Sequence, residues 1–246
     1  MRRDEHRWFS GNLGHDMDVI VYGHAGKPLI CFPSKDGRTR DWESFGMVDC
    51  VADMLEQGKL MMFAVDSIDW QSWTNASAGP GDRARRHNDY HRYITDEVVP
   101  FVRSESGREL AWTTGCSMGA FHAANFFFRR PDLFDGVIAM SGVYSPSHFV
   151  GDYSGDDDVY FNSPPSYLPS LDDPWHLERY RRSRIVFCVG QGSFEEPMIA
   201  DTHAMQELLH QKGIYATFDY WGQDAEHHWF WWQKMLRHHL EPLWSE

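Results

Sequence analysis

The chain has 246 residues, of which 42% are hydrophobic and 24% are charged, enough for one large hydrophobic core. Its 23 Lys and Arg against 36 Asp and Glu give a formal net charge of −13. No dense basic tract offers the surface that binding to nucleic-acid phosphates requires. No stretch approaches the roughly 20 apolar residues of a membrane-spanning helix, and the N-terminal residues lack the apolar core of a secretion signal. We therefore expect a single domain over residues 1–246, located in the cytoplasm, with no nucleic-acid or membrane partner.

Short apolar runs alternate along the chain with longer segments of helical period. We predict strands at residues 17–22, 28–32, 60–65, 110–114, 137–140, 184–190 and 215–221. We predict helices at about 41–57, with Phe45, Val48, Ala52 and Leu55 on one face, and at about 82–103, 120–129, 199–212 and 228–243. Residues 145–180, rich in proline and acidic side chains, show no period and are expected to form an irregular excursion over the sheet. This order is typical of an α/β protein with a mostly parallel sheet and helices on both faces.

One motif in this pattern indicates chemistry. The predicted strand 110–114 runs into Gly115-Cys-Ser-Met-Gly119, and a helix follows directly. Small residues on both sides of Ser117 allow the tight turn of a nucleophile elbow, which projects the serine hydroxyl above the sheet edge. The simpler interpretation is an ordinary Gly-Ser turn at the end of a strand. The position of the motif between a buried strand and a helix favours the elbow.

A serine nucleophile needs a histidine base, which a carboxylate in turn orients. In a strand–elbow–helix setting the three follow in the order Ser, acid, His. Glu195 and Glu196 lie in the loop after strand 184–190, and His227 and His228 follow strand 215–221. Their positions alone do not decide which of the two glutamates is the acid or which of the two histidines is the base.

The elbow, the loop Gly-Gln-Gly-Ser-Phe-Glu-Glu-Pro (190–197) and the run His-His-Trp-Phe-Trp-Trp (227–232) resemble the esterase D-like family. This group of α/β-hydrolases is related to S-formylglutathione hydrolases, feruloyl esterases and mycolyltransferases, and the resemblance covers nearly the whole chain. It implies the α/β-hydrolase fold, with the insertion at about 145–180 over the active site. The family's H-x-W-x-x-W setting selects His227. Its Gly-x-Gly-x-Trp-Glu loop selects Glu195, whereas a comparison with the transferases selects Glu196.

Acyl transfer also needs two N–H donors for the oxyanion of the tetrahedral intermediate. The N–H of Met118, directly after the nucleophile, is the first candidate. The second should come from the loop after strand 28–32, where the resemblance points to the backbone of Ser34 or Lys35. Pro33 has no N–H to donate.

These residues predict a serine carboxylic-ester hydrolase that acts on a small-molecule ester through an acyl-enzyme on Ser117. His227 would act as general base and acid, and Glu195 would orient it. We expect no metal or organic cofactor, and a pocket lined by aromatic residues that include Trp70 and Trp73. Two alternatives remain: an acyltransferase with the same triad, and a non-catalytic binding protein with the same fold.

Two further features are interpreted conservatively. His87 and His91 are four residues apart on a predicted helix, the spacing of a zinc pair, but the expected Glu after the first His is absent. We interpret them as a solvated or hydrogen-bonded helix pair. The aromatic residues near the C-terminus leave a homodimer open.

Overall fold

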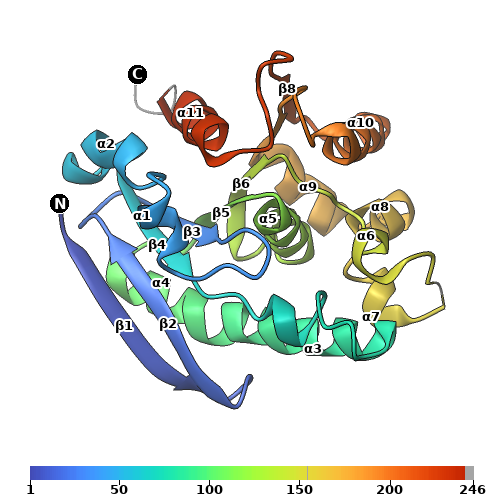
Figure 1. Cartoon of the computed structure of the whole chain (residues 1–246), viewed down its shortest axis with the longest axis horizontal. Helices are drawn as coiled ribbons and strands as arrows, with labels where there is room; N and C mark the ends of the chain where they lie inside the picture. The colour runs from blue at the N-terminus through green and yellow to red at the C-terminus, as the bar shows by residue number, and fades with distance from the viewer. Residues whose placement is uncertain (154, 242–246) are drawn as a thin grey trace.

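The computed structural model of the protein describes residues 1–153 and 155–241. An eight-stranded sheet in the order β1-β2-β4-β3-β5-β6-β7-β8 forms its centre (Figure 1). The strands are β1 (Arg3–Ser10), β2 (His15–Tyr22), β3 (Lys27–Phe32), β4 (Leu60–Val65), β5 (Ala111–Cys116), β6 (Phe134–Met140), β7 (Arg184–Val189) and β8 (Thr217–Tyr220). β1 pairs with β2 and β2 with β4 in antiparallel fashion, whereas all pairs from β4 to β8 are parallel. The predicted mostly parallel sheet is confirmed.

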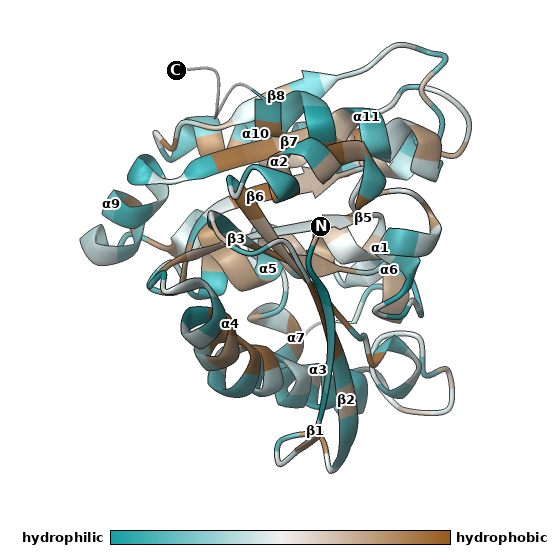
Figure 2. Ribbon diagram, turned by 90° about the vertical axis from the view of Figure 1, so that its left-hand side faces the viewer, coloured by the Kyte–Doolittle hydropathy of each residue, from teal (hydrophilic) through white to brown (hydrophobic). Residues whose placement is uncertain are grey.

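The central strands are apolar throughout because both faces of the sheet are covered. All six residues of β4, Leu-Met-Met-Phe-Ala-Val, are buried, as expected for a parallel strand between two helical layers. Figure 2 shows this hydrophobic character on strands such as β6 and β7, with helices on either side. Within the described residues, no helix combines the length and the hydrophobicity needed to cross a membrane.

Two helical layers enclose separate hydrophobic clusters. The first layer contains α3 (Pro80–Tyr93), the π-helical turn η3 (Ile94–Val98), α4 (Val99–Ser106), α5 (Met118–Arg129), α9 (Pro174–Arg182) and α10 (Glu196–Gln211). The second contains α1 (Asp41–Ser44), η1 (Asp49–Val51), α2 (Ala52–Glu56) and α11 (Trp229–Leu240). The predicted helix at 82–103 is thus a longer helical run, 80–106, with a π turn in its middle.

The single helix predicted for residues 41–57 is wrong. The chain turns after α1 because Gly46 takes φ 73°, outside the right-handed helical region. Phe45, expected on the buried face, is instead 45% exposed and stacks on Trp229 of α11 with ring centroids 4.6 Å apart. The apolar spacing that suggested one helix comes from two short helices and a 3-10 turn that bury Trp42, Val51 and Leu55 separately.

Residues 145–180 do leave the sheet, but the expectation that they lack helices is wrong. They form α6 (Ser147–Val150), α7 (Asp157–Tyr160), α8 (Pro164–Tyr167), the 3-10 turn η4 (Leu168–Ser170) and most of α9. Proline, which suggested irregular structure, occupies the first turn of α8, η4 and α9. Its missing N–H has no intrahelical partner there in any case, so proline begins these helices rather than breaking them.

Candidate active site

Ser117 lies between the end of β5 and the start of α5, at the carboxyl edge of the parallel strands. Its backbone has φ 57° and ψ −120°, a conformation that a residue with a side chain adopts only under strain. Gly115 and Gly119 make this turn sterically feasible. A Cβ on Gly115 would lie 2.2 Å from the Gly119 carbonyl, and one on Gly119 would lie 2.4 Å from the Pro33 oxygen. The geometry is that of a tight elbow pressed against the loop after β3.

Three side chains from distant parts of the chain meet at this elbow. The Nε2 atom of His227 lies 2.9 Å from the Ser117 Oγ, and its Nδ1 atom lies 3.3 Å from Oε2 of Glu195. Glu195 is completely buried, and its other oxygen accepts a 2.6 Å hydrogen bond from the Ser141 hydroxyl. The ring of His227 packs edge-on against Trp232, with centroids 4.8 Å apart. We refer to Ser117, His227 and Glu195 together as the Ser–His–Glu cluster.

The other member of each sequence pair lies elsewhere. Glu196 is exposed and is the first residue of α10. His228 is the N-cap of α11, and its Nδ1 accepts a 3.2 Å hydrogen bond from the Phe230 N–H. Neither side chain takes part in the contacts of the Ser–His–Glu cluster.

The loops that carry Glu195 and His227 are joined by backbone hydrogen bonds. The N–H of Gly192 donates to the Ala225 oxygen at 2.8 Å, and that of His227 to the Ser193 oxygen at 3.1 Å. A Cβ on Gly190 would lie only 2.1 Å from the Ala225 oxygen, so this close approach requires glycine. Phe194 projects from the same loop with φ 67° and is 80% exposed. The acid and the base are therefore positioned as one unit.

The residues predicted as oxyanion donors flank the elbow. Met118 is the first residue of α5, where helical N–H groups have no intrahelical partner and can face an anion. Ser34 and Lys35 lie in a turn after β3, closed by a 2.9 Å hydrogen bond from the Gly37 N–H to the Ser34 oxygen. The contact of Gly119 with Pro33 places this turn beside the elbow.

The two tryptophans predicted to contact substrate differ in exposure. Trp70 is 36% exposed, with the Arg38 guanidinium 4.0 Å above its ring. Trp73 has no exposed surface and packs in a cluster with Met118 and Phe121, behind the elbow. Trp70 is thus available to a ligand, whereas Trp73 supports the helix that carries Ser117.

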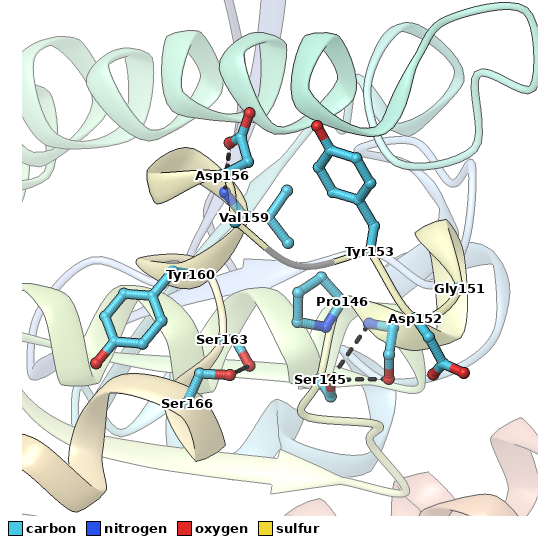
Figure 3. Close-up of a pocket in the computed structure, with 12 residues that line it drawn as sticks. Ser145, Pro146, Gly151, Asp152, Tyr153, Asp156, Val159, Tyr160, Ser163 and Ser166 are labelled. Carbon is cyan, nitrogen blue, oxygen red and sulfur yellow. Dashed lines mark hydrogen bonds between the residues drawn. The ribbon is translucent and has the colours of Figure 1, made fainter.

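The excursion after β6 encloses a cavity of about 420 Å³ (Figure 3). Its wall includes the hydroxyls of Ser145, Ser163 and Ser166 and the rings of Tyr153 and Tyr160. All of its lining residues come from positions 145–166, so no member of the Ser–His–Glu cluster takes part. The excursion therefore forms a polar cavity that is separate from the Ser–His–Glu cluster.

The interpretation of His87 and His91 as a solvated or hydrogen-bonded pair is wrong. Both are buried, and neither nitrogen of His87 has a hydrogen-bond partner within the described chain. Burial lowers the pKa of both imidazoles well below the usual value, so they are neutral. Among the described residues, the group that could hold a metal ion lies elsewhere: Asp219, His238 and His239 bring three ligand atoms within 4.8 Å of one another, between β8 and α11.

Sequence reasoning missed three polar residues near the elbow. Ser141 holds the buried carboxylate of Glu195, and the buried His122 of α5 contacts Asp69. Ser141 directly follows β6, and a polar residue at the carboxyl end of a central strand is a usable signal. The His122–Asp69 contact joins residues 53 positions apart, and no local pattern indicates it.

The sheet order and the helices on both faces of the sheet define the α/β-hydrolase fold. A family model described as “Putative esterase” matches residues 10–242, so the chain belongs to this esterase family and is an esterase. This confirms the resemblance inferred from the motifs.

Solved structures show the same fold at low sequence identity. A ferulic acid esterase matches with a TM-score of 0.76 and 17% identity, over 97% of this chain and 96% of that one. The S-formylglutathione hydrolase FrmB from Staphylococcus aureus matches with a TM-score of 0.73 and 14% identity, over 98% and 96%. MPT51 from Mycobacterium tuberculosis matches with a TM-score of 0.74 and 12% identity, over 97% and 96%. Among curated proteins no match was found.

Proposed function

We propose that the protein hydrolyses small-molecule carboxylic esters through an acyl-enzyme on Ser117, with His227 as general base and acid and Glu195 as the orienting carboxylate. The observation that carries this proposal is the 2.9 Å contact between Ser117 Oγ and His227 Nε2. It occurs at a serine whose backbone is strained, with φ 57°, and such strain is concentrated at functional sites. Membership of an esterase family supports the same chemistry.

The reaction divides into two halves. As Ser117 Oγ attacks the ester carbonyl, its proton passes to His227 Nε2, and the Glu195 carboxylate stabilises the resulting imidazolium through Nδ1–H. The oxyanion accepts hydrogen bonds from the Met118 N–H and from an N–H of Ser34 or Lys35. Collapse of the intermediate expels the alcohol, which takes the proton from Nε2. Water then attacks the acyl-enzyme and gives a proton to His227. As the acyl–oxygen bond breaks and the acid leaves, His227 returns that proton to Ser117 Oγ.

Two exposed aromatic side chains suit an ester with an apolar or aromatic group. Trp70 follows β4 and Phe194 follows β7, and ligands of α/β proteins bind beyond the carboxyl ends of the strands, where Ser117 also lies. Both rings are open to contact, with exposed fractions of 36% and 80%.

A series of p-nitrophenyl esters from acetate to octanoate tests the proposal, with Ser117→Ala as the comparison. We expect hydrolysis by the native protein, with kcat at least about 10³-fold lower in the variant. A fluorophosphonate probe should label the native protein and leave Ser117→Ala unlabelled. Hydrolysis that survives the substitution, or a native protein that neither turns over any ester nor reacts with the probe, would overturn the proposal. Product analysis with added alcohol separates hydrolysis from acyl transfer.

A further inference from the structure

A buried polar contact joins the helix of the elbow to a segment beyond β4. His122 lies on α5, five positions after Ser117, and has no exposed surface. Its Nε2 lies 2.9 Å from Oδ1 of Asp69, which is 1% exposed and begins the 3-10 turn η2 (Asp69–Gln71). A buried carboxylate without partners is costly, so the position of Asp69 depends on what its two oxygens contact.

The second oxygen of the same carboxylate contacts the loop after β3. Oδ2 of Asp69 accepts a 3.1 Å hydrogen bond from the backbone N–H of Asp36. Asp36 directly follows Lys35 and has φ 55°, in the left-handed region that a side chain disfavours. One carboxylate therefore connects α5, which carries Ser117, with the turn that contains the proposed oxyanion donors Ser34 and Lys35.

The rest of this loop is held from the same segment. The Thr74 hydroxyl donates to Oδ1 of Asp36 at 2.6 Å, and the Ser67 hydroxyl donates to the Gly37 oxygen at 3.0 Å. The N–H of Thr39 donates to Oδ1 of Asp66 at 2.9 Å. Residues 66–74 thus form a clamp on residues 36–39, and Asp69 is the point at which the clamp is attached to α5.

An oxyanion donor must be placed to within a fraction of an ångström, because its hydrogen bond has to match an atom that becomes charged only in the transition state. Lys35 and Asp36 are exposed, so packing does not fix this part of the turn. Hydrogen bonds from the clamp supply the constraint that packing lacks.

We propose that Asp69 is a positioning residue, held by His122, that fixes the loop after β3 so that one of its N–H groups faces the oxyanion. This inference rests on the proposed esterase function. It concerns the geometry of the transition-state donor, and Asp69 itself contacts neither substrate nor the reacting atoms.

Asp69→Leu tests the inference, because leucine has the branched shape of aspartate but neither of the oxygens that contact His122 and the Asp36 N–H. We expect kcat to fall about 10- to 100-fold, which does not exceed the fall in kcat that removal of a whole oxyanion donor causes. KM should change less than about threefold. The pH midpoint of kcat/KM should stay unchanged, because His227 and Glu195 are untouched. His122→Phe should give a similar loss, and the double variant should lose little more than either single one, because both act through one contact.

Thr113→Val is the matched control. It removes another buried hydrogen bond to α5, the 3.0 Å contact from the Thr113 hydroxyl to the Ala123 oxygen, without touching the clamp. We expect it to lower the unfolding temperature with kcat unchanged. A purely structural role for Asp69 predicts the same result in Asp69→Leu, and that result would overturn the inference. Should Asp69→Leu fail to fold, Thr74→Val weakens the clamp from the side of Asp36 and should lower kcat in the same direction by a few-fold.

Hydrogen–deuterium exchange provides a readout that does not depend on activity. Peptides covering residues 33–39 should exchange faster in Asp69→Leu and His122→Phe than in the native protein, whereas Thr113→Val should leave them unchanged. Unchanged exchange in both clamp variants would contradict the inference. A native protein that hydrolyses no ester, but shows faster loop exchange in the variants, would overturn the proposed function and leave the positioning of the loop supported.

Discussion

At the scale of single residues, Glu195 and Glu196 are neighbours in sequence with opposite environments. Glu195 is completely buried between His227 and Ser141, whereas Glu196 is exposed at the start of α10. We predict that Glu195→Gln lowers kcat by about 10³- to 10⁴-fold, because the amide cannot stabilise the imidazolium. Steady-state kinetics with p-nitrophenyl acetate measure this, with Glu196→Gln as the matched control at near-native kcat. The reverse pattern would move the acid to Glu196.

The same reasoning separates the two histidines. Loss of the base in His227→Ala should lower kcat by orders of magnitude. His228 instead caps α11 through the Phe230 N–H. We predict that His228→Ala retains kcat but lowers the free energy of unfolding by about 0.5–1 kcal/mol. Thermal unfolding should register a fall of about 1–4 °C. Loss of activity in His228→Ala without loss of stability would contradict this assignment.

What the sequence can predict at this scale depends on how local the signal is. Ser117 is recognisable because glycines at fixed spacing make an elbow. Strand order places the acid and base loops but leaves Glu195 or Glu196 and His227 or His228 open, and only the family resemblance selected Glu195 and His227. Asp69 and His122 meet through tertiary packing, which no spacing rule encodes. Trp73 is a second example. Its place in a loop suggested that it lines the pocket, but it is buried against Met118, and this burial depends on where α5 lies.

At the scale of elements, Glu97 anchors the antiparallel hairpin of β1 and β2 to the helical layer. It accepts hydrogen bonds from Trp8 Nε1 at 2.9 Å, from the Ser10 hydroxyl at 2.8 Å, and from the backbone and side chain of Asn12 at 3.2 and 2.8 Å. Burial alone raises the pKa of Glu97, but these hydrogen bonds outweigh it and hold the pKa below the usual glutamate value.

This pKa gives the pH dependence a definite sign. Because the folded pKa lies below the unfolded one, the stabilisation is present above the unfolded pKa and is lost as the pH falls through the folded value. We predict that Glu97→Ala lowers the free energy of unfolding by about 1–3 kcal/mol at pH 7, and by less at acid pH. Chemical denaturation at both pH values measures the difference. Exposed Glu207 of α10 gives the control Glu207→Ala, and a pH-independent difference would contradict the prediction.

Besides the helices of residues 145–180, sequence analysis missed elements whose pattern is set by an edge or a turn. β1 alternates exposed and half-buried residues and is charged on both faces, because it lies at the sheet edge and covers the helical layer only in part, with His6 and Trp8 against Phe101 and Trp8 also against Tyr93. Such a strand lacks the apolar run that identified β4. Within residues 41–57, α1 ends before Gly46, whose φ is positive. The spacing of the apolar residues does not reveal this end.

At the scale of the whole molecule, the formal net charge of −13 acts on any charged substrate. A negative surface potential lowers the local concentration of anions and slows their association with the site. The effect extends over a Debye length, about 30 Å at 0.01 M salt but about 3 Å at 1 M. Arg38, above the exposed ring of Trp70, is a local positive charge that opposes this field over short distances.

We therefore predict that kcat/KM for an ester with a free carboxylate, such as p-nitrophenyl hemisuccinate, rises at least about twofold as ionic strength increases from about 0.01 to 0.5 M. The value for neutral p-nitrophenyl acetate should stay nearly constant, and kcat should change little for either, because salt screens encounter rather than the chemistry in the bound state. Parallel curves for the two esters would show that the net charge has no influence at the site. If kcat/KM fell with salt for the anionic ester alone, local cations would dominate over the net charge. Arg38→Gln would then be the variant that removes this fall in kcat/KM.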